Sequence, residues 1–130
     1  MKVTARVLAA TVVAVAALTP APASAATPSI ICTYRITTTW LGGFMADLYI
    51  ANQGTTAING WNARWSMRTE TSGLSAWSAV MTMPTPYSMT AANLPWNGTI
   101  PPGSVASFGW TARALSTEVP ADITVNNTPC

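Results

Sequence analysis

Apolar and polar side chains alternate along three stretches of this chain, and this alternation constrains the fold more than any other feature. The first stretch has Phe44, Ala46, Leu48 and Ile50 on one face, and Met45, Asp47, Tyr49 and Ala51 on the other. The second sets Trp61, Ala63, Trp65 and Met67 against Asn62, Arg64, Ser66 and Arg68. The third sets Ala106, Phe108 and Trp110 against Val105, Ser107, Gly109 and Thr111. A period of two is typical of β-strands with one buried face, so Trp61, Trp65 and Trp110 are predicted core residues.

Shorter β-like stretches lie at residues 34–39, 76–81, 87–92 and 123–125, with Gly, Pro, Asn or Thr between them. After residue 25, no window longer than eight residues shows the helical period of 3.6. Several short strands separated by turn signals within roughly 100 residues are typical of a β-sandwich. We therefore expect an all-β, antiparallel sandwich.

Residues 1–25 have the pattern of a secretory signal peptide. Lys2 and Arg6 precede an apolar run over residues 7–18, which is followed by Pro20 and by small residues up to Ala25. A transmembrane anchor needs about 20 apolar residues, and this run has 12. We therefore expect a secreted, extracellular protein, without stable membrane insertion, whose domain occupies residues 26–130.

The charges exclude several classes of function. The chain has 6 Lys+Arg, 4 Asp+Glu and no His, and without Lys2 and Arg6 the remaining charges cancel. The absence of histidine excludes His-based triads and His-containing metal sites. No basic cluster suits a phosphate backbone, so nucleic acid is not an expected partner. We expect no cofactor, no metal site and a monomer.

The two cysteines, Cys32 and Cys130, lie near the start and at the end of the expected domain. In an oxidising compartment such a pair persists as a disulfide, and two cysteines allow one pairing. A free or metal-binding pair is the alternative, and it is less common in secreted domains. The disulfide interpretation places the two termini close together.

The other three tryptophans, Trp40, Trp77 and Trp96, fall outside the core assignment, because each stands at an expected turn or strand end beside Gly, Ser, Pro or Asn. Indoles in such places tend to be exposed to solvent, and a group of exposed flat rings is typical of a binding surface. A single tryptophan is nevertheless more often a packing residue. Spacing alone leaves both interpretations open.

The order of motifs resembles carbohydrate-binding module family 2, the cellulose-binding modules of bacterial plant-polysaccharide enzymes, in its type A subgroup. The motifs are a cysteine near the start, 40–44 (WLGGF), 58–61 (INGW), 93–100 (NLPWNGTI), 108–110 (FGW) and 125–130 (VNNTPC). The resemblance implies a sandwich of the immunoglobulin-like or jelly-roll type with about nine strands and a disulfide joining the ends. It also implies that Trp40, Trp77 and Trp96 form a planar strip that binds insoluble β-1,4-linked polysaccharide, which is cellulose or, alternatively, chitin.

Family members often line this strip with Asn and Gln. The positions that match them here are Thr38, Asp47, Ser75, Ser107 and Thr111. These side chains are shorter, and the Asp47 carboxylate accepts hydrogen bonds but donates none at neutral pH. The set implies weaker binding, or binding tuned to a glycan with N–H donors such as chitin, and ordinary solvated strand surface is the alternative.

The sequence favours a binding module over an enzyme. A glycoside hydrolase needs two carboxylates across a cleft, and no such pair stands out among Asp47, Glu70, Glu118 and Asp122. We expect a stand-alone secreted binder with no catalytic residues. The alternatives are an accessory piece of a secreted chitinase or cellulase, or a protein grouped with such hydrolases by family, and a surface or host-facing interaction protein.

Overall fold

The structure, a computed structural model, describes residues 3, 11, 13–14 and 29–130. The signal peptide predicted over residues 1–25 lies almost entirely outside the described residues. Within the described part of the chain, no helix has the length and apolar character of a membrane span.

Residues 29–130 fold into eleven strands and no helix, which confirms the all-β prediction. The strands are β1 (Ile30–Trp40), β2 (Gly43–Asn52), β3 (Ile58–Asn59), β4 (Asn62–Ser66), β5 (Ser72–Trp77), β6 (Val80–Thr85), β7 (Ser88–Ala92), β8 (Thr99–Ile100), β9 (Val105–Arg113), β10 (Thr124–Val125) and β11 (Thr128–Pro129). The number exceeds the nine that the resemblance implied. Four of the eleven, β3, β8, β10 and β11, are strands of only two residues.

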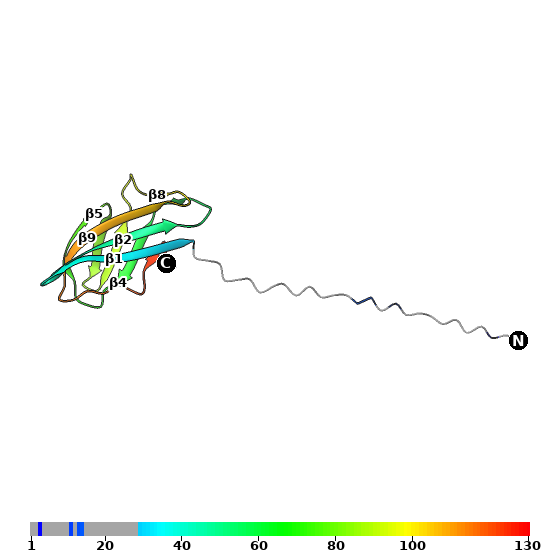
Figure 1. Cartoon of the computed structure of the whole chain (residues 1–130), viewed down its shortest axis with the longest axis horizontal. Helices are drawn as coiled ribbons and strands as arrows, with labels where there is room; N and C mark the ends of the chain where they lie inside the picture. Colours follow the sequence, from blue (N-terminus) through cyan, green and yellow to red (C-terminus); the bar gives the residue numbers. More distant parts are fainter. Residues whose placement is uncertain (1–2, 4–10, 12, 15–28) are drawn as a thin grey trace.

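Two antiparallel sheets make up the sandwich. The first has the strand order β1-β2-β9-β5, the second has the order β11-β10-β4-β7-β6, and β3 pairs with β8. In Figure 1, β1, β2 and β9 run side by side, with β4 of the second sheet behind them. The three alternating stretches of the sequence form β2, β4 and β9, and each turns its apolar face inward.

Aromatic rings fill the space between the sheets. Trp61 stacks on Phe108 with ring centroids 5.2 Å apart, and Trp65 lies 5.1 Å from Trp110. Tyr34 meets the Trp110 ring edge-on at 5.4 Å. Such offset and edge-to-face arrangements are favoured because the aromatic faces are electron-rich and the edges are positive.

One sequence prediction of a strand was wrong. Residues 76–81 were expected as a single stretch, but the chain turns at Ser78, where φ is +64°, and so divides the stretch between β5 and β6. This left-handed conformation is uncommon for serine, and no glycine or asparagine marks the turn in the sequence.

The disulfide prediction is confirmed, because Cys32 on β1 is bonded to Cys130. Their Cα atoms lie 5.3 Å apart although 98 positions separate them in the sequence. Figure 1 accordingly shows the C-terminus beside the start of β1.

Candidate functional site

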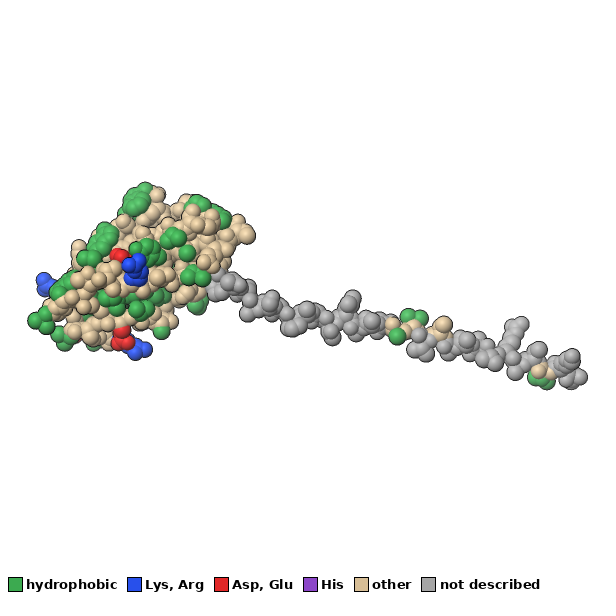
Figure 2. Space-filling view, in the orientation of Figure 1, with side chains coloured by type: hydrophobic (Ala, Val, Ile, Leu, Met, Phe, Trp, Pro, Cys, Tyr) green, Lys and Arg blue, Asp and Glu red, His purple; other side chains and the backbone are tan. Residues whose placement is uncertain are grey.

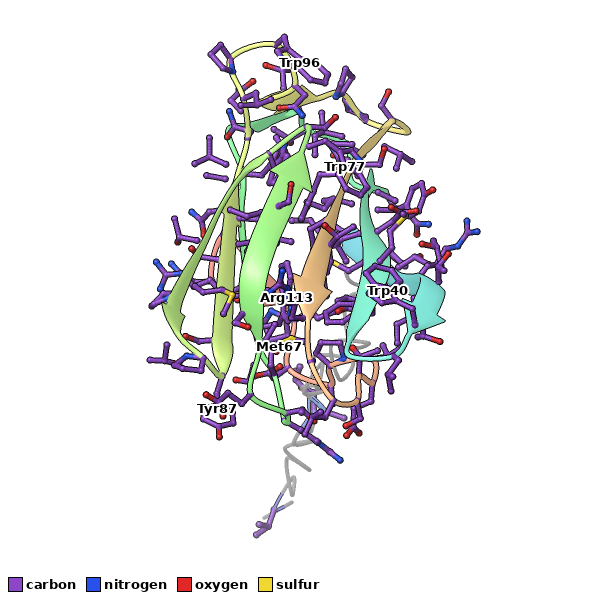
Figure 3. All side chains as sticks on the ribbon, turned by 90° about the vertical axis from the view of Figure 1, so that its left-hand side faces the viewer. Trp40, Met67, Trp77, Tyr87, Trp96 and Arg113 are labelled. Atoms are coloured by element: carbon purple, nitrogen blue, oxygen red, sulfur yellow. A yellow bond between two sulfur atoms is a disulfide. The ribbon has the colours of Figure 1, made fainter. Side chains whose placement is uncertain are left out.

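Exposure divides the six tryptophans in the way that the sequence predicts. Trp40, Trp77 and Trp96 are exposed, at 48%, 43% and 71%. Trp61, Trp65 and Trp110 are buried, at 2%, 3% and 0%. In Figure 3, Trp96 lies at the top of the molecule, with Trp77 below it and Trp40 lower and to the right.

Strand register places Trp40 and Trp77 on the outward-facing side of the first sheet, which we call the outer face. Residues that pair across antiparallel strands point to the same side, so they form rows on this face. One row contains Trp40, Gly43 and Arg113, and another contains Asp47, Gly109 and Trp77. The rows are four positions apart along β2, from Gly43 to Asp47, which is about 13 Å along the strand.

Both of these indoles pack on a glycine of a neighbouring strand. A Cβ atom placed at Gly43 would lie 2.5 Å from Trp40 Nε1, and one placed at Gly109 would lie 2.5 Å from Trp77 Cζ2. The rings therefore occupy space that any other residue would need for its side chain.

Trp96 lies in the turn between β7 and β8 and is held there by its neighbour Asn97. The Leu94 N–H donates to Asn97 Oδ1 over 2.7 Å, and Asn97 Nδ2 donates to the Ser78 carbonyl over 2.7 Å. Since Ser78 directly follows Trp77, this side chain connects the turn of Trp96 to the end of β5. The Asn97 carbonyl also accepts from Trp61 Nε1, which ties the turn to the core.

The five predicted polar residues all lie at outer-face positions. Thr38, Thr111 and Ser75 form a row through Met45, between the rows of the two tryptophans. Asp47 lies in the row of Trp77, and its Oδ1 is 2.6 Å from the place where a Cβ of Gly109 would be. Ser107 pairs with Tyr49 in the next row.

Sequence reasoning missed several residues that share these rows. The outer-face rows also include Arg35, Met45, Tyr49 and Arg113. The Arg35 guanidinium lies 5.6 Å from the centre of the Tyr49 ring, which is the distance of a cation–π contact. The alternation of residues 44–51 already placed Met45 and Tyr49 on this side, whereas Arg35 and Arg113 become neighbours only through strand pairing.

A polar depression lies beside Trp77. It has a volume of about 210 Å³, and its lining includes Asp47, Tyr49 and Ser107. These groups place hydrogen-bonding atoms beside the ring, which suits a ligand with an apolar face and polar edges.

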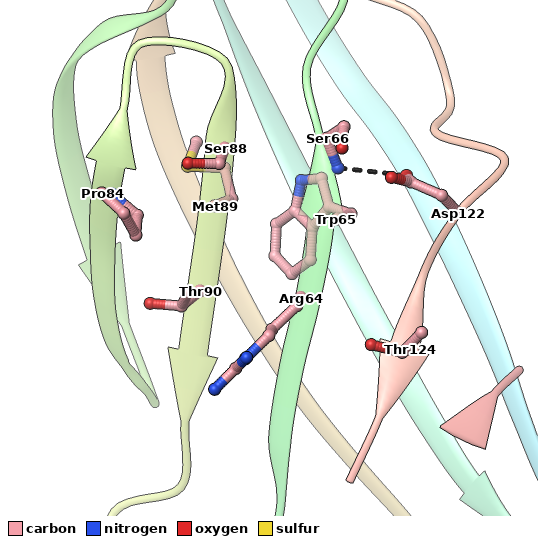
Figure 4. Close-up of a pocket in the computed structure, with 9 residues that line it drawn as sticks. All are labelled: Arg64, Trp65, Ser66, Pro84, Ser88, Met89, Thr90, Asp122 and Thr124. Carbon is pink, nitrogen blue, oxygen red and sulfur yellow. Dashed lines mark hydrogen bonds between the residues drawn. The ribbon is translucent and has the colours of Figure 1, made fainter. Parts of the chain in front are cut away.

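The second sheet carries a different groove, shown in Figure 4. Its volume is about 300 Å³, and it is lined by Arg64, Trp65, Ser66, Pro84, Ser88, Met89, Thr90, Asp122 and Thr124. Trp65 is buried under it, so the groove offers hydroxyl groups but no exposed ring. The Ser66 N–H donates to Asp122 Oδ1 over 3.0 Å, so the carboxylate that lines the groove already accepts a hydrogen bond from the protein.

The acidic side chains do not form the pair that glycoside hydrolysis requires. Glu118 and Asp122 line one depression, but Glu118 is paired with Arg68 at 3.2 Å. A hydrogen bond from the Ser66 side chain lowers the pKa of Asp122, whereas a general acid needs a raised pKa. Within residues 29–130, Asp, Glu and Cys do not gather in any group of three that could hold a metal ion. Figure 2 likewise shows few charged side chains on the side that it presents.

The sequence model of the family described as "Cellulose binding domain" matches residues 30–130. Endo-1,4-beta-xylanase A of Cellvibrio japonicus is 44% identical over 79 residues, which are 61% of this chain and 12% of the enzyme. Chitinase C of Streptomyces lividans is 36% identical over 109 residues, 84% of this chain and 17% of the enzyme. The chain thus spans less than a fifth of the length of these relatives.

Two solved domains have the same fold. The chitin-binding domain of Chi18aC from Streptomyces coelicolor is 33% identical with a TM-score of 0.66, and the match covers 78% of this chain and 94% of that domain. The cellulose-binding family 2 carbohydrate binding domain of ScLPMO10C is 29% identical with a TM-score of 0.56. That match covers 75% of this chain and 94% of the domain.

Proposed function

The chain belongs to the cellulose binding domain family over residues 30–130, and from this membership we propose that its outer face is the surface that binds polysaccharide. The protein is a non-catalytic carbohydrate-binding module of the cellulose- and chitin-binding kind. The observation that supports the proposed face is the exposure of Trp40 and Trp77 on it, together with the exposed Trp96 in a turn that is hydrogen-bonded to Ser78 at the end of β5.

The chemistry of a β-1,4-linked glucan suits this surface. The faces of its sugar rings carry C–H groups that pack on an indole, and its edges carry hydroxyl groups that bond to short polar side chains. If each indole loses about 100 Å² of accessible surface to the ligand, it contributes about 2.5 kcal/mol. Removal of one ring should therefore weaken binding about 60-fold.

Chitin is a ligand of the same surface in this proposal. Asp47 and Tyr49 border the depression beside Trp77, where the acetamido N–H of chitin can donate to the carboxylate. The similarity to the chitin-binding domain of Chi18aC supports this choice. We further propose that the protein is secreted and binds insoluble polysaccharide outside the cell, because residues 1–25 have the pattern of a signal peptide.

The test is a depletion binding assay with the purified protein on microcrystalline cellulose and on chitin. Trp40→Ala, Trp77→Ala and Trp96→Ala should each bind about 60-fold more weakly than the wild type. Tyr87→Ala is the matched control, because Tyr87 is an exposed aromatic residue at the far end of the molecule from Trp96. It should bind like the wild type.

Three results would contradict the proposal. A wild-type protein that stays in the supernatant with both polymers removes the polysaccharide function. Tryptophan variants that bind as well as the control place the binding surface elsewhere. Release of reducing sugar by the pure protein would show that it is an enzyme.

A further inference from the structure

Two glycines of the outer face are buried although their positions point to solvent. Along β9 the outward-facing residues Ser107 and Arg113 are exposed, but Gly109 between them is buried. Gly43 is likewise buried at the start of β2, while Asp47 on the same side of the strand is partly exposed. Something on the outer face therefore covers both glycines.

The backbone does not require glycine at either position. The described glycines with positive φ are Gly42, Gly60, Gly73 and Gly103. Gly43 and Gly109 adopt a φ that any residue can adopt, and glycine is less favourable than alanine within a strand. Their identity must have another reason.

The reason is the space that the indoles occupy. Cε2 and Cζ2 of Trp77 lie 2.6 and 2.5 Å from the place of a Gly109 Cβ, and Nε1 and Cε2 of Trp40 lie 2.5 and 2.7 Å from that of Gly43. Non-bonded carbon atoms prefer a separation of about 3.5–4.0 Å, so a methyl group at either position would move its ring outward by about 1 Å.

We propose that Gly109 and Gly43 are positioning residues that set the indoles of Trp77 and Trp40 at one height above the outer face, for a flat crystalline polysaccharide. The inference rests on the proposed function. A crystalline surface cannot bend around a raised ring, so raising Trp77 by about 1 Å also withdraws contact from the other rings. An amorphous polymer has flexible chains and can follow the uneven surface.

The test compares Gly109→Ala with the wild type on crystalline and on amorphous cellulose. We expect Gly109→Ala to bind crystalline cellulose at least tenfold more weakly and amorphous cellulose within about threefold of the wild type. Its melting temperature should stay close to that of the wild type, because the preference of strands for alanine over glycine opposes the loss of ring packing. Ala51→Ser is the control, since it adds one heavy atom to the same side of β2, four residues from Asp47, and it should bind normally.

A Gly109 side chain would meet both the Trp77 ring and the Asp47 carboxylate, and a double variant distinguishes the effects of the two contacts. If the glycine acts through Trp77, the Trp77→Ala/Gly109→Ala variant should bind like Trp77→Ala alone. A tenfold further loss in the double variant would overturn the inference, and so would normal crystalline binding by Gly109→Ala. Gly43→Ala with Trp40→Ala repeats the cycle at the other indole, although a Gly43 Cβ would also lie 3.0 Å from the Ala112 carbonyl oxygen.

Acrylamide quenching of tryptophan fluorescence adds a readout that needs no polymer. Gly109→Ala should increase the quenching, because the raised ring is more accessible, whereas Ala51→Ser should not. If the wild type binds no polysaccharide, the proposed function fails while this optical change still supports the positioning role. If the wild type binds and the quenching is unchanged in Gly109→Ala, the positioning role fails alone.

Discussion

At the scale of single residues, Tyr34 is a buried polar group without a hydrogen-bond partner among the described residues. Its ring packs edge-on against Trp65 and Trp110, with centroids 6.0 and 5.4 Å away. Burial removes the hydroxyl from water and raises the pKa of Tyr34 above its ordinary value, because the charged phenolate is disfavoured in an apolar site. The ring therefore stabilises the core while the hydroxyl group opposes folding.

Tyr34→Phe should increase the free energy of unfolding by about 1 kcal/mol at neutral pH, because it removes an unpaired buried hydroxyl and keeps the ring. The raised native pKa also makes a prediction about pH. The unfolded chain releases the phenol proton near pH 10, whereas the folded protein keeps it to a higher pH. The free energy of unfolding is therefore unaffected by this group below about pH 10 and decreases as the pH rises beyond it. Tyr34→Phe should lose less stability than the wild type between pH 9 and pH 11.

Urea denaturation at each pH measures both effects, with the exposed Tyr87→Phe as the control. A variant that is less stable than the wild type at pH 7 would show that the hydroxyl is satisfied in solution.

At the scale of elements, the turn over residues 93–98 carries Trp96 and depends on the two asparagine side chains beside it. Asn93 Oδ1 accepts from the Trp61 N–H at 2.9 Å, and Asn97 joins Leu94 to Ser78. The turn is therefore hydrogen-bonded both to the core and to the end of β5. These bonds fix the position of Trp96 although its ring is exposed.

The Asn97→Asp variant tests the hydrogen bond from Asn97 to the Ser78 carbonyl. The carboxylate still accepts from the Leu94 N–H but can no longer donate to the Ser78 carbonyl, and two oxygens then face each other. We expect stability to fall by about 1–2 kcal/mol and binding to crystalline cellulose to fall about tenfold. In a Trp96→Ala background the same change should have little effect on binding, as depletion isotherms would reveal.

Asn127→Asp is the matched control, because Asn127 is an exposed turn residue with φ of +64° and aspartate tolerates that conformation. An equal binding loss from Asn97→Asp with and without Trp96 would mean that the turn acts on binding by another route.

At the scale of the whole molecule, one disulfide joins the first strand of the sandwich to the C-terminal residue. Cys32 and Cys130 are 98 positions apart, so the bond restricts nearly the whole described domain in its unfolded state. Trp40 and Trp77 of the outer face lie on β1 and β5, Trp96 lies in the turn after β7, and the disulfide involves none of these residues. Stability and binding should therefore respond differently to its loss.

The Cys32→Ser/Cys130→Ser variant should lose up to about 4.7 kcal/mol of unfolding free energy, the value that the chain-entropy model gives for a loop of roughly 100 residues. Binding of the folded variant at low temperature should stay within about twofold of the wild type. Denaturation with and without a reducing agent measures the first quantity, and the reduced wild type should match the variant. A large loss of binding in the folded variant would show that the disulfide also determines the structure of the outer face.

Local patterns in the sequence were sufficient for much of the fold. The alternation around Leu48, Trp65 and Phe108 predicted β2, β4 and β9, because a strand with one buried face needs an apolar residue at every second position. The same pattern predicted the three buried tryptophans, whereas the exposure of Trp40, Trp77 and Trp96 was implied by the resemblance to the family and not by spacing. It failed at Ser78, because a left-handed serine leaves no mark in the composition of its neighbours.

The sequence by itself determined the fold class and the three buried tryptophans, since both depend on residue type and on spacing along the chain, and its two cysteines allowed a single disulfide pairing. Only the tertiary structure decided which residues share a row. Asp47, Gly109 and Trp77 become neighbours through the pairing of β2, β9 and β5, and no local pattern encodes that register. The two glycines under the indoles became interpretable for the same reason, because the ring that covers each one lies on a different strand.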